Sequence, residues 1–246
     1  MKDNLINFKP KEIDLYNSNH KSDKKYSNLS KKIINKPWGY EFVIFQNKKF
    51  AIWVLCIRPK KYTSMHCHVL KKTILIPLSN KLRISTLDQI FYNKKIYNIY
   101  PKVFHQTYNG GLANKYLIEI EFPNLKNDIV RLHDYYGRIS NKFSKENKLN
   151  SIKKNNYLLK KNTRVKNLKF GKKNFIFLQN FSSKRALNLE NYKKKFNYLI
   201  VLNGNIKCFK EKSKKTILYA ENVYNLKEII LSKKIITQND TQMLII

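Results

Sequence analysis

Three of the five histidines have the types of neighbours and the spacing that a metal site needs. One residue separates His66 from His68, so on a β-strand both imidazoles point to the same face. His105 follows about 40 residues later, and a third histidine from another strand can close a facial three-nitrogen site for a divalent metal ion. The spacing therefore predicts a metal centre formed by His66, His68 and His105. The alternative is that these histidines are polar liners of a barrel that only packs or passively binds a ligand.

Short β-strands must position these side chains. Apolar runs rich in Ile, Val, Tyr and Phe recur about every ten residues, which is typical of a β-sandwich or barrel. These runs lie at 42–45, 50–57, 73–78, 81–87, 96–100 and 116–122. A second block with the same pattern contains 175–179 and the hairpin 196–209, with Gly204 at its turn. Two blocks of one pattern predict a duplicated all-β domain.

The metal-site residues resemble the motifs of the cupins, in which HxH is followed by a carboxylate and a later histidine is followed four residues on by asparagine, here His105 and Asn109. A narrower resemblance, over residues 35–138, is to the cupin domain of type II phosphomannose isomerases, as found fused to mannose-1-phosphate guanylyltransferases. The segments that carry it are 36–41 (KPWGYE), 64–71 (SMHCHVLK), 117–121 (LIEIE) and 128–138 (DIVRLHDYYGR).

The resemblance implies an all-β chain built on a cupin jelly-roll barrel, with two tandem barrels (a bicupin) of which the second is degenerate. The expected divisions are a polar N-terminal arm at 1–34, a barrel with a partial metal site at 35–138, a linker at 139–165 and a second cupin-like domain at 166–246. The second domain contains no histidine, so it lacks the metal ligands of the family.

The carboxylate ligand of the cupins is missing from its expected place, because Lys72 and Thr73 stand there. A cation beside three neutral imidazoles repels a divalent ion unless Lys72 points outward or loses its proton. A three-histidine site can still hold Zn, Fe, Mn or Ni, so we expect a divalent metal without identifying it.

Two acidic and two basic side chains are candidates for the chemistry. Glu119 and Glu121 share one strand face; inside the barrel, Glu119 can ligate the metal or move a proton, and outside it both are solvent charges. Glu119 and Lys72 are the candidate catalytic residues. Lys71 matches the basic residue after HxH in the family, which implies contact with an anionic group of the ligand, although a solvated lysine is the alternative.

The segment after the last predicted strand of the first block alternates acidic and basic residues. We expect Asp128, Arg131, Asp134 and Arg138 to form a structural ion-pair clasp. A phosphate-binding role for Arg131 or Arg138 is the alternative. The predicted substrate-binding residues are Lys71, Asn109, Arg131 and Arg138.

The net charge of +34 comes from 44 lysines and only six arginines spread along 246 residues, which is typical of AT-rich codon usage rather than of a specific nucleic-acid site. No apolar run is long enough to span a bilayer, and the first residues lack a secretory signal, so we expect a cytoplasmic protein. The cysteines Cys56, Cys67 and Cys208 are expected to be buried free thiols.

The resemblance implies a protein that acts on a sugar phosphate or nucleotide sugar in surface-polysaccharide biosynthesis, as a mannose-6-phosphate isomerase does. The alternative function is a non-catalytic cupin that binds a sugar or a partner protein. Neither specific nucleic acid nor a membrane is an expected partner. Cupins often dimerise, but no residue of this sequence shows it.

Overall fold

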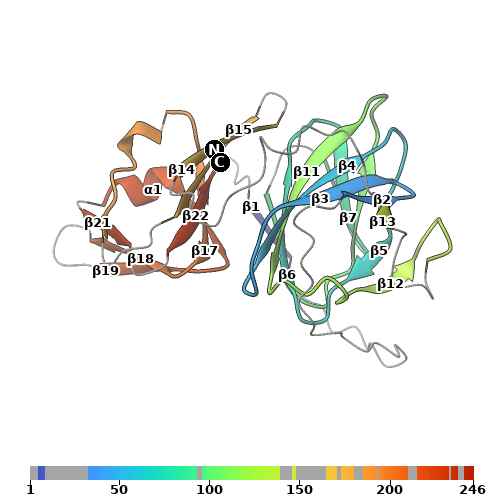
Figure 1. The fold of residues 1–246 in the computed structure, drawn as a ribbon, viewed down its shortest axis with the longest axis horizontal. Helices are drawn as coiled ribbons and strands as arrows, with labels where there is room; N and C mark the ends of the chain where they lie inside the picture. The colour runs from blue at the N-terminus through green and yellow to red at the C-terminus, as the bar shows by residue number, and fades with distance from the viewer. Residues whose placement is uncertain are drawn as a thin grey trace. The chain divides into compact units, whose positions relative to one another are not determined.

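The computed structural model describes residues 5–8, 33–92, 96–138, 146–147, 165–170, 173–179, 185–192, 194–209, 215–232, 234–237 and 241–246. The chain divides into two compact units, Met1–Leu158 and Leu159–Ile246 (Figure 1). Strands dominate both units, and the five-residue α1 (Leu226–Ile230) is the α-helix of the described part. The prediction of an all-β fold is confirmed. No helix among the described residues is both long and apolar enough to pass through a membrane.

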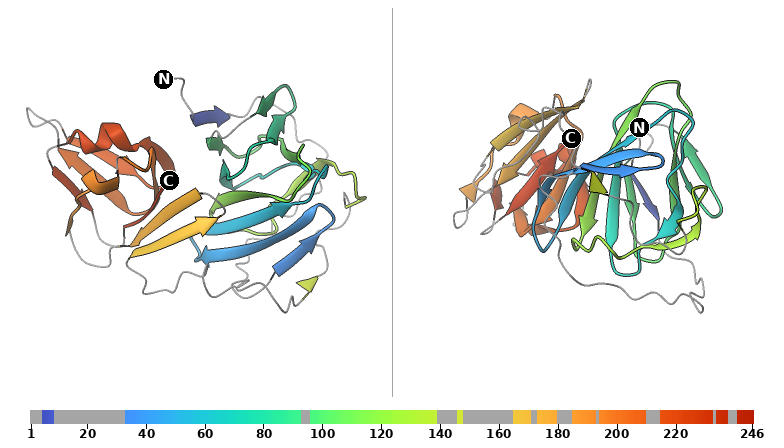
Figure 2. Two further views of the ribbon diagram at one scale, coloured as in Figure 1. Left: turned by 90° about the horizontal axis from the view of Figure 1, so that it is seen from above. Right: turned by 45° about the vertical axis from the view of Figure 1, so that its right-hand side comes forward.

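Two sheets build the first unit. The larger has eight strands in the order β1 (Leu5–Phe8), β9 (Ile96–Ile99), β6 (Lys72–Pro77), β11 (Lys115–Phe122), β4 (Ala51–Ile57), β3 (Gly39–Gln46), β2 (Ile33–Lys36) and β13 (Glu146–Asn147). The smaller has the order β12 (Val130–His133), β5 (Met65–Cys67), β10 (His105–Asn109), β7 (Leu82–Thr86) and β8 (Ile90–Tyr92). From β4 to β7, successive strands belong to alternate sheets, which is the arrangement of a jelly roll (Figures 1 and 2).

The interior of the first unit contains an apolar cluster and, bordering it, a cavity lined by polar side chains. Trp53, Leu55 and Leu75 are buried in the main apolar cluster, together with Ile84 from the opposite sheet. Every residue of β4 is buried, so this strand has a continuous apolar run rather than an alternating one. The end of β4 packs closely against Gly39, the first residue of β3, where a Cβ would lie 1.9 Å from the carbonyl oxygen of Cys56.

The second unit repeats the strand order of the first. Its larger sheet has the order β14 (Val165–Phe170), β15 (Lys173–Gln179), β22 (Gln242–Ile245), β17 (Tyr198–Asn203) and β20 (Asn222–Asn225). Its smaller sheet has the order β16 (Arg185–Ala186), β21 (Lys234–Thr237), β18 (Asn205–Phe209) and β19 (Lys215–Tyr219). Taken in chain order, these strands correspond one to one with β3-β4-β11-β6-β9 and β5-β10-β7-β8 of the first unit. A short 3-10 helix, η2 (Glu190–Tyr192), follows β16.

The interior of the second unit is apolar. The side chains of its buried cluster include Leu199, Val201, Ile206, Ile235 and Met243, contributed by strands of both sheets. The predicted tight turn is present, and Gly204 has the positive φ of 73° that it requires. The prediction of a hairpin was wrong, because β17 and β18 belong to different sheets and the turn carries the chain from one sheet to the other. The sequence of this unit contains no histidine, and its described residues offer no site of the kind found in the first unit.

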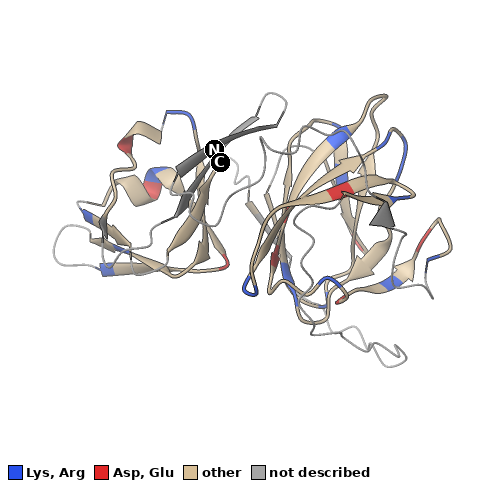
Figure 3. Ribbon diagram, in the orientation of Figure 1, with Lys and Arg blue, Asp and Glu red and all other residues tan. Residues whose placement is uncertain are grey.

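Parts of the predicted arm and linker lie outside the described residues. Within the arm, Leu5–Phe8 forms β1 and pairs in parallel with β9, and Ile33 and Ile34 belong to β2. Within the linker, Glu146–Asn147 forms β13 against β2, and Val165 begins β14. His20 lies outside the described residues. Lysines and arginines are distributed over both units (Figure 3) rather than gathered on one motif.

Candidate metal centre

The three predicted histidines meet inside the first unit. His66 on β5 lies directly opposite His105 on β10 in the antiparallel register, and His68 follows the end of β5. One ring nitrogen from each histidine lies within 4.8 Å of the other two. The ring centroids are 4.5 to 5.5 Å apart. This spacing is what a facial set of three imidazole ligands requires.

Backbone carbonyls fix the protonation of all three rings. The Nδ1 atoms lie 2.8 Å from the carbonyl oxygen of Ser64 for His66, 2.5 Å from that of Asp128 for His68 and 3.0 Å from that of Val103 for His105. A carbonyl only accepts, so each Nδ1 carries the hydrogen and each Nε2 keeps a lone pair.

The Nε2 atoms of His68 and His105 are buried, and neither has a hydrogen-bond partner in the described part of the chain. Burial lowers the pKa of all three imidazoles, to about 4 for His105, so the rings are neutral at physiological pH. Neutral rings with inward, unused lone pairs are suited to ligating a divalent cation, so the residues present fit a metal.

Asp128 organises the loop that carries His68. Its carboxylate accepts hydrogen bonds from the backbone N–H groups of Val69 (3.1 Å), Leu70 (2.9 Å) and Lys71 (2.8 Å), and its carbonyl accepts from His68. The sequence predicted an ion-pair clasp for this residue. In the structure, Asp128 instead closes the connection between β5 and β6.

Two carboxylates of β11 face the same cavity as the histidines, which selects the interior position among the two that the sequence left open. Glu121 accepts a hydrogen bond from Trp53 Nε1 at 2.9 Å and pairs with Lys71 Nζ at 2.5 Å. Glu119 has no hydrogen bond or ion pair of this kind within the described residues, although it is only 8% exposed. One of its oxygens lies within 4.8 Å of a ring nitrogen of His68. Burial and the neighbouring Glu121 raise the pKa of Glu119 to about 7.

The two adjacent lysines have different positions. Lys71 is 1% exposed, lines the cavity and ends at Glu121. Lys72 begins β6 with the opposite orientation, its Nζ lies 4.9 Å from the centre of the Tyr100 ring, and it does not line the cavity. The condition that Lys72 points outward is therefore met, which removes the expected repulsion of a metal and leaves Lys72 away from the chemistry.

Asn109 stabilises a turn rather than facing the cavity. Its Nδ2 donates to the carbonyls of Ile57 and Ala113, and its Oδ1 accepts from the backbone N–H of Gly111. All the hydrogen-bonding atoms of its side-chain amide are thereby used. The structure places this predicted substrate-binding residue at the end of β10, outside the cavity lining.

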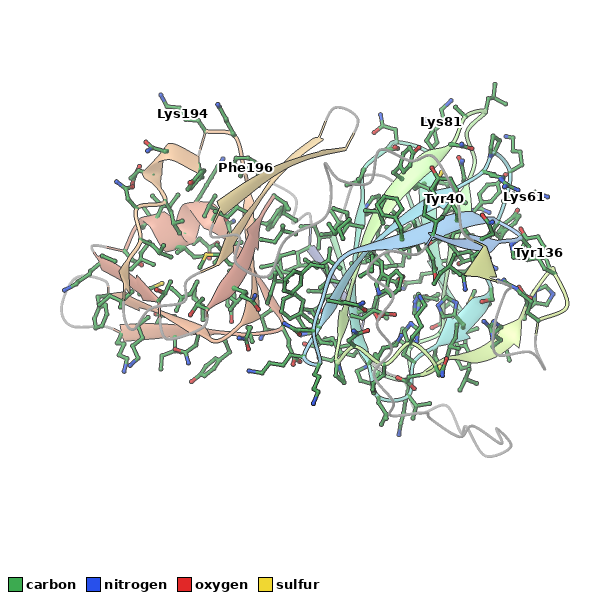
Figure 4. All side chains as sticks on the ribbon, viewed as in Figure 1. Tyr40, Lys61, Lys81, Tyr136, Lys194 and Phe196 are labelled. Carbon is green, nitrogen blue, oxygen red and sulfur yellow. The ribbon has the colours of Figure 1, made fainter. Side chains whose placement is uncertain are left out.

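Basic side chains form a second wall of the cavity. Arg131 and Arg138 line it. Their role in substrate binding stays a prediction. Arg138 also makes a two-point contact with Asp134, at 2.8 and 2.6 Å, so this pair of the predicted clasp is present. The centre of the Tyr136 ring lies 6.0 Å from Lys61 Nζ, and both residues are at the edge of the unit (Figure 4).

Sequence reasoning missed a buried charge cluster in this wall. Glu41 pairs with Lys126 at 2.6 Å and Lys36 at 3.5 Å, and Lys126 lies 3.8 Å from the centre of the Trp53 ring. Burial alone raises the pKa of Glu41, but the two ammonium groups outweigh it and lower the pKa to about 2. Lys36 and Glu41 belong to the KPWGYE segment, which could have drawn attention to them; nothing in the sequence marks Lys126.

The lining of the cavity combines the histidines, the two carboxylates and this basic wall. Its volume is about 70 Å³. One water needs about 10 to 15 Å³ on this scale, so the cavity has room for an ion together with a small group of ligand atoms.

No protein-family model and no curated protein matches the sequence. Similarity to solved structures does exist. The matched structures are cupins and double-stranded β-helix proteins. One is the capsular polysaccharide assembling protein CapF from Staphylococcus aureus, with 15% sequence identity and a TM-score of 0.35; the match covers 42% of this chain and 34% of that chain. Another is a protein with a double-stranded β-helix domain from Klebsiella pneumoniae, with 14% identity and a TM-score of 0.35; the match covers 45% of this chain and 90% of that chain. A third is a sugar phosphate isomerase of the cupin superfamily from Silicibacter pomeroyi, with 10% identity and a TM-score of 0.31; the match covers 34% of this chain and 58% of that chain.

The matched region spans about a third of the length of the CapF chains. At these identities and TM-scores the comparisons carry no conclusion about activity. The description of the first unit as a jelly roll follows from its own strand order, and this is the fold that the resemblance in the sequence implies.

Proposed function

We propose that the chain is a metal-dependent cupin that binds a sugar phosphate and interconverts its aldose and ketose forms, as a mannose-6-phosphate isomerase does. The observation that carries the proposal is the set of three neutral imidazoles with Nδ1 fixed by backbone carbonyls and Nε2 directed into a cavity. A buried carboxylate and a basic wall complete that cavity.

His66, His68 and His105 would hold the metal. When bound, a divalent ion supplies a Lewis acid that polarises a carbonyl oxygen of the substrate. Arg131 is the group we assign to the phosphate, because a guanidinium matches the geometry of that anion and this one lines the cavity. Arg138 adds positive charge at the same wall while Asp134 fixes its orientation.

Proton transfer requires a group that can both accept and return a proton. In the aldose-to-ketose direction, a C–H bond breaks at the carbon next to the carbonyl and a C–H bond forms at the carbonyl carbon, while the hydroxyl proton moves between the two oxygens. We assign the carbon-to-carbon proton to Glu119, because Glu121 is occupied by Lys71 and Trp53. Lys72 has no part in this proposal, because it lies outside the cavity lining.

The test is isomerisation of mannose 6-phosphate, followed by NMR, after the protein is loaded in turn with Zn, Fe, Mn or Ni. We expect turnover that is lost in His105→Ala and retained in His133→Ala, an exposed histidine outside the cavity lining. Absence of turnover with every metal, despite a bound ion, would exclude this reaction.

A non-catalytic cupin that binds a sugar or a nucleotide sugar is the second candidate. The occupation of positions 72 and 73 by lysine and threonine favours it, since the usual carboxylate is absent there. In that case His105→Ala would keep its affinity for the sugar in a calorimetric titration, whereas an enzyme of the proposed kind loses turnover.

The second unit has an apolar interior, so we propose that it has a structural role beside the binding barrel. A role in surface-polysaccharide synthesis, a cytoplasmic location and a homodimer remain predictions of the same proposal.

A further inference from the structure

We infer that Glu119 is the carboxylate ligand of the metal centre and that it replaces, from β11, the carboxylate that the resemblance expects at position 72 or 73 of β6. The inference rests on the proposed function, because it concerns the same metal centre. It assigns to this chain a ligand set of three histidines and one glutamate whose acidic member comes from a different strand.

The register between β6 and β11 shows that a carboxylate on β11 lies close to the position where the resemblance expects the ligand on β6. β6 and β11 are hydrogen-bonded neighbours, in which Glu121 lies opposite Thr73 and Glu119 lies opposite Leu75. Side chains directly opposite each other in an antiparallel pair project to the same face with Cβ atoms about 5 Å apart. A carboxylate on β11 can therefore reach the interior beside the position that Thr73 holds.

The contacts select Glu119 rather than Glu121. Both oxygens of Glu121 are engaged, one by Lys71 Nζ and the other by Trp53 Nε1. Glu119 is more than nine-tenths buried, lines the cavity and has no hydrogen-bond or ion-pair partner among the described residues. Burying a carboxylate without a partner is costly, so a group left in this state is one that a ligand must complete.

The charges also agree with this assignment. Lys71 and Glu121 form a buried pair with no net charge, and Lys72 directs its ammonium group away from the cavity. An oxygen of Glu119 and one of Glu121 both lie within 4.8 Å of a ring nitrogen of His68. Because the charge of Glu121 is balanced by Lys71, Glu119 is the carboxylate of this pair that is left to balance a divalent cation. Lys71, the cation inside the cavity, is thus neutralised by Glu121, while Glu119 on the same strand face supplies the ligand.

Ligation is compatible with the proton-transfer role proposed above. A carboxylate has two oxygens, so one can contact a metal while the other accepts a proton. The two roles separate experimentally, because only the ligand role changes metal affinity and the metal's spectrum in the absence of substrate.

The experiment is titration of the metal-free protein with Co²⁺, measured by calorimetry and by the visible d–d bands, for the unmodified chain, Glu119→Gln and Glu121→Gln. Changes next to metal ligands commonly cost 10- to 100-fold in affinity, so we expect loss of the ligand itself in Glu119→Gln to cost about 100-fold and to alter the d–d bands. Glu121→Gln leaves Lys71 uncompensated and is expected to weaken binding while the bands keep their positions and intensity.

A Glu119→Gln protein that binds Co²⁺ with unchanged affinity and bands overturns the inference, as do bands that change in Glu121→Gln alone. If the unmodified chain binds no Co²⁺, the metal centre of the proposed function fails as well, which distinguishes the two failures. Glu119→Asp guards against a folding defect, because it keeps the charge and is expected to recover part of the affinity. Thermal unfolding of each metal-free variant verifies that it is folded.

Discussion

Replacing Asp128 by asparagine tests how the connection between β5 and β6 is held. The carboxylate accepts hydrogen bonds from three backbone N–H groups at 2.8 to 3.1 Å; that of Lys71 is buried, and those of Val69 and Leu70 are partly buried. A hydrogen bond to a charged group contributes about 1.5 to 3 kcal/mol, against about 0.5 to 1.5 for a neutral one. The asparagine oxygen can keep the bonds from Leu70 and Lys71, but its amide group would face the N–H of Val69. That donor is partly buried, so leaving it without its partner costs about 1 kcal/mol, the lower end of the range for an unpaired donor.

The weakening of two bonds and the loss of the third add up to a destabilisation of about 3 to 4 kcal/mol. This is a large part of the 5 to 15 kcal/mol that stabilises a typical domain. Urea unfolding followed by tryptophan fluorescence measures it selectively, because both tryptophans, Trp38 and Trp53, belong to the first unit.

The control is Asp88→Asn, on an exposed turn, which is expected to change stability by no more than about 0.5 kcal/mol. Asp128→Asn is also expected to lower metal affinity by about 10- to 100-fold, because the same loop carries His68. A loss of stability below about 1 kcal/mol would refute the role given to this carboxylate.

Three further predictions concern burial and charge in other places. The pKa of Glu41 falls from 4.5 to about 2 on folding, so its contribution to the free energy of unfolding is fully present above about pH 4.5 and disappears as the pH falls toward 2. When the free energy of unfolding is measured against pH, Glu41→Gln should lack this loss of about 3 kcal/mol. The free thiols of Cys56, Cys67 and Cys208 are buried, so Ellman's reagent should label them only after urea is added, and rapid labelling of the native chain would contradict their burial. Gly39→Ala should destabilise the first unit by more than about 3 kcal/mol in the same fluorescence assay, because its Cβ would overlap the carbonyl oxygen of Cys56; a variant as stable as the original would show that β3 can shift.

The fold was accessible from the sequence because its strands are short, apolar and regularly spaced. The histidine triad was accessible for the same reason, since the two-residue period of a strand places His66 and His68 together once the strand is recognised. The strand period also places Glu119 and Glu121 on one face, but it does not say which face is the interior. Only the packing of the two sheets, which places both carboxylates in the cavity lining, settles that point.

Roles that depend on long-range contacts were not accessible. Lys71 and Lys72 are adjacent and chemically identical in the sequence, and only the orientation at the start of β6 separates a buried partner of Glu121 from a side chain beside Tyr100. Asp128 has the composition of an ion-pair residue, yet its carboxylate accepts from the backbone of a loop 57 to 59 residues away. No local pattern encodes a contact of that length.

The two units share one strand order, but their interiors place different requirements on the amino-acid sequence. In the first barrel, a substitution in the interior must preserve charge and the direction of lone pairs, so few replacements are neutral. In the second, the interior requires only that apolar volume be conserved, and many combinations of Leu, Ile, Val and Met satisfy that condition. Across related chains, the second unit should therefore accumulate interior substitutions faster than the first. It is also the part in which loops can be exchanged by design without disturbing the three histidines.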